Sequence, residues 1–230
     1  MKKNKQQCDL KSCLFCKLCL PEWLSAVEVN RQNLQVKKGE VIFKEGETMT
    51  GIYFVYTGTV KVHKQWGSDK ELILRFARKG DIFGHRGLGK DTVYPISATA
   101  LENSTVCFIP LEFFMSSLKV NHEFMFQLML FFAEELKVSE RKMRNLAHMH
   151  VKGRITQAIL SLHEKFGVSD NGYIDILLSR QDIASYAGTT YETVFRVMNE
   201  LTENELLSVD GKKITIKNFD GLKKLTKEAD

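Results

Sequence analysis

The sequence has no run of uncharged apolar residues long enough to cross a membrane as a helix, which requires about 18 or more. Its first residues, Met1 to Gln7, are polar and basic, and the apolar core of a secretory signal does not follow them. These absences predict a cytoplasmic protein with no membrane partner.

Proline and linker-like sequence are also scarce. The 230 residues include only three prolines and no glycine/serine tract, so we expect no long flexible linker between folded parts. Apolar residues make up 43% of the chain and charged residues 27%, which is enough apolar material for a packed core and argues against disorder. The net charge of +5 permits a polyanionic partner without identifying one.

The motifs of several common enzyme classes are missing as well. The chain contains no Gly-x-Gly-x-x-Gly after a strand, no phosphate loop, no Gly-x-Ser-x-Gly and no His-Glu-x-x-His. The sequence therefore predicts a protein that is not an enzyme.

The first half of the chain has the pattern of a β-protein. Between residues 34 and 115, short apolar segments alternate with turn dipeptides that contain glycine. Apolar residues recur at every second position in Gly58–His63, and the segments Glu71–Ala77 and Ala98–Ile109 are also strand-like. Many short strands with glycine turns predict a sandwich, a barrel or a roll.

A different pattern begins near Asn121. No glycine or proline occurs from there to about His150, and one set of residues follows alternating steps of four and three, which is the spacing of a coiled-coil seam. That set is Met125, Met129, Phe132, Leu136, Ser139, Met143 and Leu146. We interpret the segment as a dimerisation helix; the alternative is a helix that packs on its own β-domain. Gly153 predicts a break, with another helix over Arg154–Phe166.

Two short helices joined by a glycine turn are predicted further on. The spacing of Ser179 and Asp182 is that of a helix N-cap and its capping box. Gly188 can supply the positive φ of a tight turn, and the spacing of Thr189 and Glu192 predicts a second capping box. This arrangement is the signature of a helix-turn-helix.

The second of these helices would insert its first turns into the major groove of DNA. Arginine can donate twice to guanine, and glutamate can accept from cytosine. The residues expected to face the bases are Tyr191, Glu192, Phe195 and Arg196, and those expected to contact phosphates are Arg180, Thr189 and Thr190. Alternatively, Glu192 only completes the capping box, or pairs with Arg196 on the helix surface.

A predicted hairpin follows the second helix. Its strands, 206–209 and 212–216, flank a turn at Asp210-Gly211. A basic hairpin directly after a recognition helix is typical of the wing of a winged helix-turn-helix, and Lys212 and Lys213 suit phosphate contacts. Together with the two helices, this hairpin predicts a protein that binds double-stranded DNA.

In this order, the segments resemble the CRP/FNR family of bacterial transcription regulators over roughly residues 20–225. The resemblance rests on Lys38–Glu40, Lys44–Glu47, Tyr56–Lys61, Lys79–Gly84, Leu178–Ala184, Tyr191–Arg196 and Gly211–Ile216. It implies an α+β fold with a double-stranded, jelly-roll-like β-roll of the cyclic-nucleotide-binding type, a long dimerisation helix and a C-terminal winged helix-turn-helix. It also implies a homodimer that binds palindromic operators and acts with RNA polymerase.

The expected organisation has four parts: a cysteine-rich arm (1–24), a β-roll sensor domain (25–120), the dimerisation helix (121–150) and the winged helix-turn-helix domain (151–230). In the family, the recognition helix carries a glutamate and, after a small residue, an arginine. Glu192 and Arg196 match these two base-reading positions, but Phe195 replaces the small residue. Phe195 would then either contact a thymine methyl group or only pack.

The signal that the protein senses is open between three hypotheses. The first is a cyclic nucleotide, which the family's nucleotide binders hold with a glutamate and an arginine. His85 and Ile96 stand at those two positions here, so both charged anchors are missing and a cyclic nucleotide is disfavoured. A pocket for another small molecule would include Gly84, His85, Arg86, Ser97 and Thr99.

The second hypothesis is an iron–sulfur cluster, because Cys13-x2-Cys16-x2-Cys19 has the spacing of cluster ligands. In the family's oxygen-sensing branch a distant cysteine of the roll joins the arm, and Leu101–Pro110 resembles its neighbourhood. The resemblance thus implies Cys107 as the fourth ligand of a 4Fe–4S cluster. The gaps after Cys8 depart from that branch, so which arm cysteines bind stays open. The third hypothesis is that the thiols bind zinc, react as redox thiols or have no ligand, and that the effector is unknown.

Overall fold

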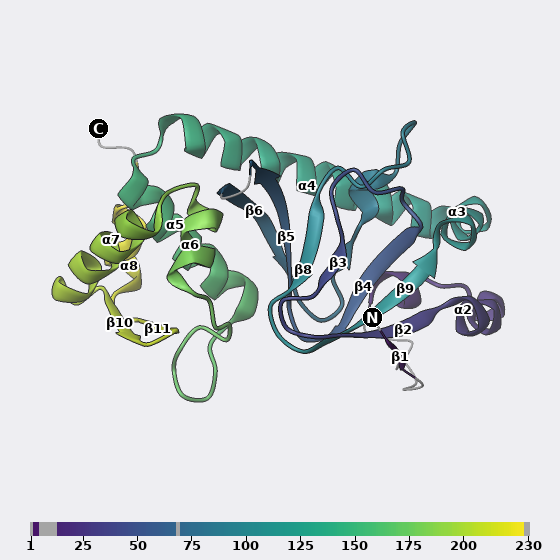
Figure 1. Ribbon diagram of the computed structural model, residues 1–230, viewed down its shortest axis with the longest axis horizontal. Coiled ribbons are helices and arrows are strands. Elements are labelled where there is room, and N and C mark those ends of the chain that lie inside the picture. The colour runs from purple at the N-terminus through teal and green to yellow at the C-terminus, as the bar shows by residue number, and fades with distance from the viewer. Residues whose placement is uncertain (1, 5–12, 68–69, 228–230) are drawn as a thin grey trace. The chain divides into compact units, whose positions relative to one another are not determined.

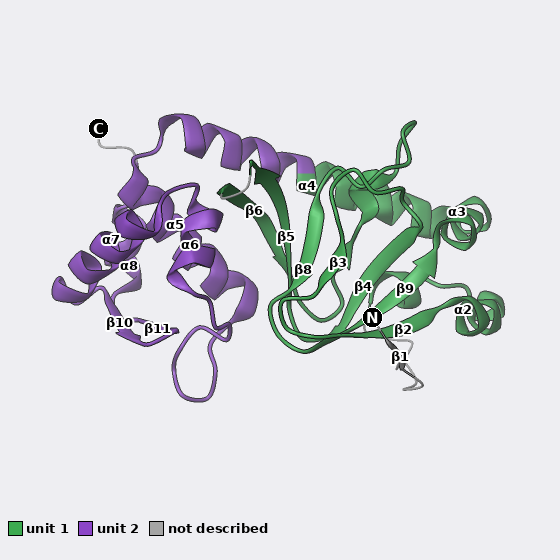
Figure 2. Ribbon diagram, in the orientation of Figure 1, with its two compact units in different colours: residues 1–135 green, residues 136–230 purple. Residues whose placement is uncertain are grey.

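The computed structural model describes residues 2–4, 13–67 and 70–227 of the chain. The chain divides into two units, residues 1–135 and 136–230 (Figure 2). Each unit is described below by itself. Among the described residues, no helix is both long enough and apolar enough to cross a membrane.

Two antiparallel sheets form most of the first unit, and Figure 1 shows them facing each other in a roll. One sheet has the strand order β1 (Lys2–Asn4), β2 (Gln32–Val36), β9 (Ser104–Pro110), β4 (Gly51–Thr57) and β7 (Ile82–Phe83). The other has the order β3 (Val41–Phe43), β8 (Ser97–Ala100), β5 (Val60–Trp66) and β6 (Lys70–Ala77). The predicted roll and the α+β fold class are confirmed.

The first unit also contains several short helices. They are α1 (Leu14–Lys17), the 3-10 turn η1 (Pro21–Trp23), α2 (Leu24–Asn30), η2 (His85–Gly87) and α3 (Leu111–Val120). The predicted strand-like run Ala98–Ile109 is interrupted by a turn and becomes β8 and β9, while the end of the predicted β-rich region is helical in α3. The α1 residue Phe15 is 2% exposed and lies among the rings of Phe54, Phe114 and Phe124, at centroid distances of 5.9, 5.9 and 5.3 Å. The arm therefore contributes to the core of the roll.

The long helix predicted after Asn121 is α4 (His122–His148). The chain leaves the helix at Met149 and His150, and α5 (Val151–Phe166) begins directly afterwards. The prediction of a break at Gly153 was wrong, because this glycine lies in the first turn of α5. A Cβ atom there would lie 3.0 Å from the backbone oxygen of Leu225, so the missing side chain permits close packing.

The second unit continues from α5 into α6 (Arg180–Ala187), α7 (Tyr191–Glu203), a two-stranded hairpin of β10 (Leu207–Asp210) and β11 (Lys213–Ile216), and α8 (Phe219–Lys224). One stripe of α7 enters the core of this unit through Val194, Val197, Met198 and Leu201. The opposite stripe faces solvent.

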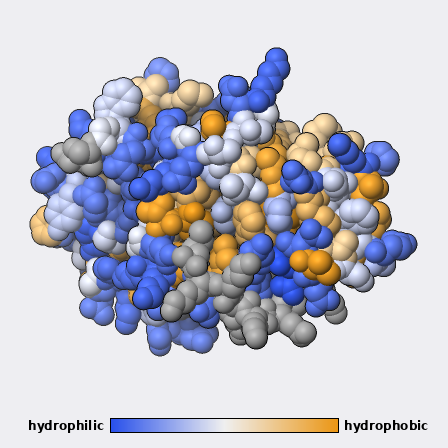
Figure 3. Space-filling view, turned by 45° about the vertical axis from the view of Figure 1, so that its right-hand side comes forward, coloured by the Kyte–Doolittle hydropathy of each residue, from blue (hydrophilic) through white to orange (hydrophobic). Residues whose placement is uncertain are grey.

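Hydrophilic residues dominate the molecular face in Figure 3, and hydrophobic residues gather there in limited patches.

Candidate functional site

The helix-turn-helix begins with the predicted capping box. The Ser179 hydroxyl accepts a hydrogen bond from the Asp182 backbone N–H at 3.1 Å, and the Asp182 carboxylate accepts one from the Ser179 N–H at 3.0 Å. Gly188 ends α6 in the left-handed region, with φ 66° and ψ 49°. The prediction of this helix and of its glycine turn is confirmed.

The second cap lies one residue later than predicted. Thr190, rather than Thr189, is the N-cap of α7, and its side chain accepts from the Thr193 backbone N–H at 3.3 Å. Glu192 therefore occupies the second helical position instead of closing the box. Hydrogen bonds from its own backbone N–H and from Thr190 lower the pKa of Glu192, which keeps this exposed carboxylate ionised.

The residues expected to read bases share the solvent-facing stripe of α7. These residues are Tyr191, Glu192, Phe195 and Arg196, and all are exposed. They fall at one-turn spacing opposite the buried stripe, because residues three and four apart lie on the same helix face. A helix with a packed inner stripe and a charged and aromatic outer stripe can present the outer one to a groove without losing its core.

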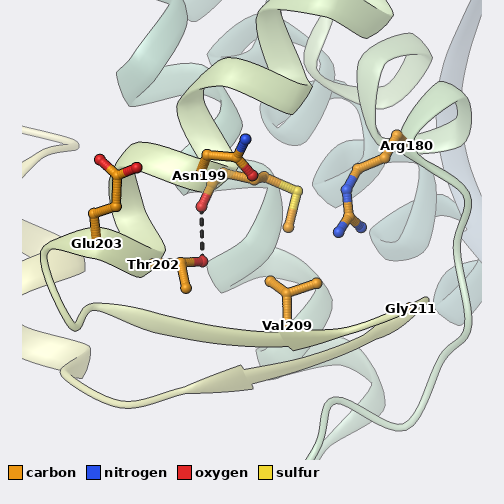
Figure 4. Close-up of a pocket in the computed structure, with 7 residues that line it drawn as sticks. Arg180, Asn199, Thr202, Glu203, Val209 and Gly211 are labelled. Carbon is orange, nitrogen blue, oxygen red and sulfur yellow. Dashed lines mark hydrogen bonds between the residues drawn. The ribbon is translucent and has the colours of Figure 1, made fainter.

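A hollow of about 410 Å³ lies beside this stripe, between the C-terminal half of α7 and the hairpin. Arg180 directs its guanidinium into it, with Asn199 and Val209 on its walls (Figure 4). Burial lowers the pKa of Arg180, and the nearby Tyr191 phenol opposes that change. Of the other predicted phosphate contacts, Thr190 is exposed and Thr189 is half-buried.

The hairpin turn also lies one residue later than predicted. Asp210 pairs with Lys213, so Gly211 and Lys212 form the two-residue loop, and Gly211 has φ 56°. A glycine at the first loop position with positive φ is the requirement of a type II′ turn. Lys212 thus stands at the exposed tip, while the Lys213 ammonium lies 5.2 Å from the centre of the Tyr173 ring.

Arg154 holds the helix-turn-helix, although its sequence pattern predicts only the start of a helix there. Its guanidinium donates to the backbone oxygens of Met149, Ala187 and Gly188, at 2.8, 3.1 and 3.2 Å. Carbonyl groups at a helix end have no partner within the helix, and a guanidinium fork can satisfy several at once. No spacing rule predicts the contacts with Ala187 and Gly188, because these residues lie 33 and 34 positions from Arg154 in the sequence and meet it only in the fold.

We expect Arg154→Ala to lower the free energy of unfolding by about 2 kcal/mol, because a charged donor with several carbonyl partners is lost. Urea denaturation followed by circular dichroism measures this change. Lys152→Ala is the matched control, since the ion pair of Lys152 with Glu200 at 2.6 Å is partly exposed and should contribute less than about 1 kcal/mol. Equal losses for the two variants would contradict the assigned role.

The predicted effector-pocket residues fall into two groups. Ser97 and Thr99 lie on β8, where Ser97 accepts from the Glu45 N–H at 2.9 Å and Thr99 meets His63 at 2.9 Å. Gly84 is instead the N-cap of η2, and His85 and Arg86 are its first two residues, so these three form the η2 segment. The two groups thus belong to different elements of the roll, β8 and η2.

The η2 segment is joined to α4 by a charged cluster. The Glu135 carboxylate contacts the Arg75 guanidinium at 3.0 Å and the Arg86 guanidinium at 3.1 Å. His85 is 2% exposed and packs its ring against Phe131 and Phe132 of α4. Burial and the positive charge of Arg75 lower the pKa of His85 to about 3, so the imidazole is neutral at physiological pH.

Three cysteines, Cys13, Cys16 and Cys107, are buried in the core of the first unit, and Cys19 packs against that core. Cys13 accepts from the Cys16 backbone N–H at 3.4 Å, and both are buried. Cys107 on β9 pairs in register with Phe54, whose ring contacts Phe15 of α1. Directly opposed residues of neighbouring strands point to the same face, so Cys107 faces the side that α1 covers.

Thiols from the arm and from β9 fit the ligand chemistry of an iron–sulfur cluster or of zinc. Cys19 is partly exposed, and burial together with Cys13 raises its pKa. Cys8 lies outside the described residues. Within the described ranges, no three histidine, cysteine, aspartate or glutamate side chains are grouped so as to hold a metal ion.

Two protein-family models match the chain, each over a separate range. Residues 33–121 match the model of the cyclic nucleotide-binding domain, and residues 153–225 match that of the Crp-like helix-turn-helix domain. The first match contains the roll strands from β3 to β9, and the second contains α6, α7 and the hairpin.

Individual relatives match over nearly the whole chain. The transcriptional activator protein Anr of Pseudomonas protegens is 30% identical over 219 residues, which cover 91% of this chain and 89% of Anr. The anaerobic regulatory protein of Haemophilus influenzae is 27% identical, over 94% of this chain and 87% of its own. The structure of FixK2 from Bradyrhizobium japonicum superimposes with a TM-score of 0.78 at 25% identity, over 87% of this chain and 99% of FixK2.

Proposed function

Since the chain belongs to the CRP/FNR family of transcription regulators, we propose that it is a cytoplasmic homodimer that reads palindromic DNA operators under the control of a signal received by its first unit. Like its relatives, it is a transcription regulator and not an enzyme. As a regulator of transcription it would act with RNA polymerase.

The observation that carries the DNA-reading part of this proposal is the exposed stripe of α7. Arg196 would donate twice to a guanine edge, and the ionised Glu192 would accept from a cytosine amino group. Around them, Arg180, Thr189, Thr190, Lys212 and Lys213 would contact phosphates. Phosphate contacts fix the position of the helix in the groove, and the base contacts then provide specificity.

The exposed apolar residues of α4 support the homodimer. Met125, Met129, Leu136, Met143 and Leu146 are all exposed in the single chain, and they belong to the predicted seam with the half-buried Phe132. A row of large apolar side chains on a helix in water favours burial against a partner. Two-fold symmetry would set the two recognition helices on half-sites about one helical turn, ~34 Å, apart.

We expect the full chain to bind duplex DNA with an affinity that falls by about 10³-fold or more between 50 and 200 mM salt, because several phosphates are neutralised together. Gel-shift titration of duplexes enriched from a random pool measures this dependence. Lys212→Ala combined with Lys213→Ala should reduce the slope by about two. The same change at the exposed Lys90 and Lys119 of the first unit is the control and should leave the slope unaltered. Binding that is absent or insensitive to salt would refute the DNA-binding proposal.

For the signal, we propose an oxygen-labile 4Fe–4S cluster held by Cys107 and by arm cysteines from the set Cys8, Cys13, Cys16 and Cys19. The shared face of Cys107 and α1 supports this ligand set, and the name of the Haemophilus relative, an anaerobic regulatory protein, supports oxygen as the signal. A bound cluster would supply a centre that oxygen destroys. The alternative is the same regulator responding to a small molecule, with the cysteines binding zinc or having no ligand.

Anaerobic purification should yield coloured protein with iron and acid-labile sulfide, and air should bleach it. Cys107→Ser should bring the iron content to background, because a ligand is lost from a buried position. Cys107→Ala is the control for packing. Both variants should retain the far-ultraviolet circular dichroism of the parent, so that the loss of iron reports the missing ligand and not a changed fold. Colourless protein that contains zinc, in an amount that Cys107→Ser does not change, would contradict the cluster.

A further inference from the structure

Two aromatic side chains stand on the exposed stripe of α7. Tyr191 and Phe195 are 45% and 51% exposed, although large apolar rings are usually buried. Their ring centres lie 6.5 Å apart and their planes are inclined by only 15°. They are placed beside Glu192 and Arg196, on the same face and within the first turns of the helix.

This pair is not needed for the core of the second unit. The inner stripe of α7 is already filled by four buried apolar residues, from Val194 to Leu201. An aromatic pair one turn apart stabilises an isolated helix by only ~0.2–0.5 kcal/mol. Local packing therefore accounts for the stacking of the two rings but not for their exposure.

The chemistry of the major groove limits what the rings can contact there. Base faces are stacked inside a duplex, and the groove edges carry hydrogen-bond donors and acceptors that a hydrocarbon ring does not satisfy. The apolar group at a major-groove edge is the 5-methyl group of thymine. The Phe195 ring, and the ring of Tyr191 apart from its phenolic hydroxyl, are therefore complementary to the methyl group of thymine.

We propose that Tyr191 and Phe195 form an apolar reader that selects thymine at positions flanking those read by Glu192 and Arg196. This inference rests on the proposed DNA-binding function and specifies the operator further. The 6.5 Å between the ring centres is close to two base steps of ~3.4 Å each, so the pair spans enough length for more than one methyl group.

The test first enriches duplexes from a pool with a random centre, using the full chain, and sequences them. In the enriched sites, each flanking thymine is then replaced by uracil, which removes the methyl group and keeps the hydrogen-bonding edges. Burying one methyl group corresponds to about fourfold in affinity, or ~0.8 kcal/mol at 1.4 kcal/mol per tenfold. We expect uracil to weaken the parent by about fourfold at a contacted position and to have no effect on Phe195→Ser at the position that Phe195 contacts.

Two comparisons make this result specific. Phe195→Leu keeps an apolar side chain and should retain part of the uracil effect, whereas Phe219→Ser removes a 39% exposed phenylalanine from α8 and should retain all of it. DNA binding without enrichment of thymine, or with equal uracil effects in the parent and in Phe195→Ser, would overturn the inference and leave the proposed function standing. If no duplex is enriched at any salt concentration, the proposed function fails and the inference fails with it.

Discussion

Replacing Arg196 by alanine should weaken binding to a matched operator by about 5- to 150-fold, which corresponds to ~1–3 kcal/mol for a bidentate base contact. Arg196 is exposed on α7, so the variant should fold with a free energy of unfolding within about 0.5 kcal/mol of the parent. The loss therefore reports the contact with DNA and not a damaged helix. Competitive gel-shift titration against single-base operator variants measures both the loss and the base position that becomes tolerant.

Arg196→Lys provides the control for charge. Lysine keeps the positive charge but lacks the planar fork, so specific binding should fall while binding to unrelated duplexes at low salt stays close to that of the parent. Unchanged affinity of Arg196→Ala for its operator would show that Arg196 does not read a base.

The second large effect is expected at Glu135, the carboxylate between Arg75 and Arg86. The side chains of Arg75 and Glu135 are 12% and 20% exposed, and that of Arg86 is 28% exposed. Glu135→Gln removes the carboxylate that Arg75 and Arg86 share, although Arg75 still lies 3.8 Å from the Asp81 carboxylate. Removing one partner of a buried ion pair costs about 3 kcal/mol or more. Because Arg86 is partly solvated, we expect ~3 kcal/mol, measured by urea denaturation of the full chain.

The pH dependence of this loss has a defined sign. Burial raises the pKa of Glu135. The charge of Arg75 and the hydrogen bond from Arg86 lower the pKa by more than burial raises it, so it lies below the ordinary value of 4.5. Its stabilising effect is therefore complete above pH 4.5 and is lost as the pH falls through the lower folded-state pKa. The difference between the parent and Glu135→Gln should be constant near neutral pH and should shrink in acid.

Glu140→Gln, an exposed change on the same helix, is the matched control and should cost less than about 0.5 kcal/mol at every pH. A loss for Glu135→Gln no greater than that of the control would remove the charged cluster as a link between the η2 segment and α4. A full loss would show that the cluster stabilises the packing of the η2 segment against α4.

Local spacing in the sequence was sufficient for the helix-turn-helix. The capping box of Ser179 and Asp182 and the left-handed Gly188 depend on residues within four positions of one another, so the pattern determines the structure there. The second cap and the hairpin turn were each displaced by one residue. Thr189 and Thr190 are equally suitable caps, and Asp210-Gly211 and Gly211-Lys212 are both acceptable turns, so only the strand register and the packing of α7 select between them.

The sequence by itself thus determined the order of the parts and the stripe of α7 that faces solvent, because these follow from periodicity and from short-range hydrogen bonds. Its resemblance to the family added the fold class, since periodicity alone left a sandwich, a barrel or a roll open. The tertiary structure decided which distant groups meet. It brought Arg154 to the end of α6, joined Glu135 to Arg75 and Arg86, and placed Cys107 on the face that α1 covers. Such contacts depend on how separate elements pack, and no spacing along the chain encodes the distance between them.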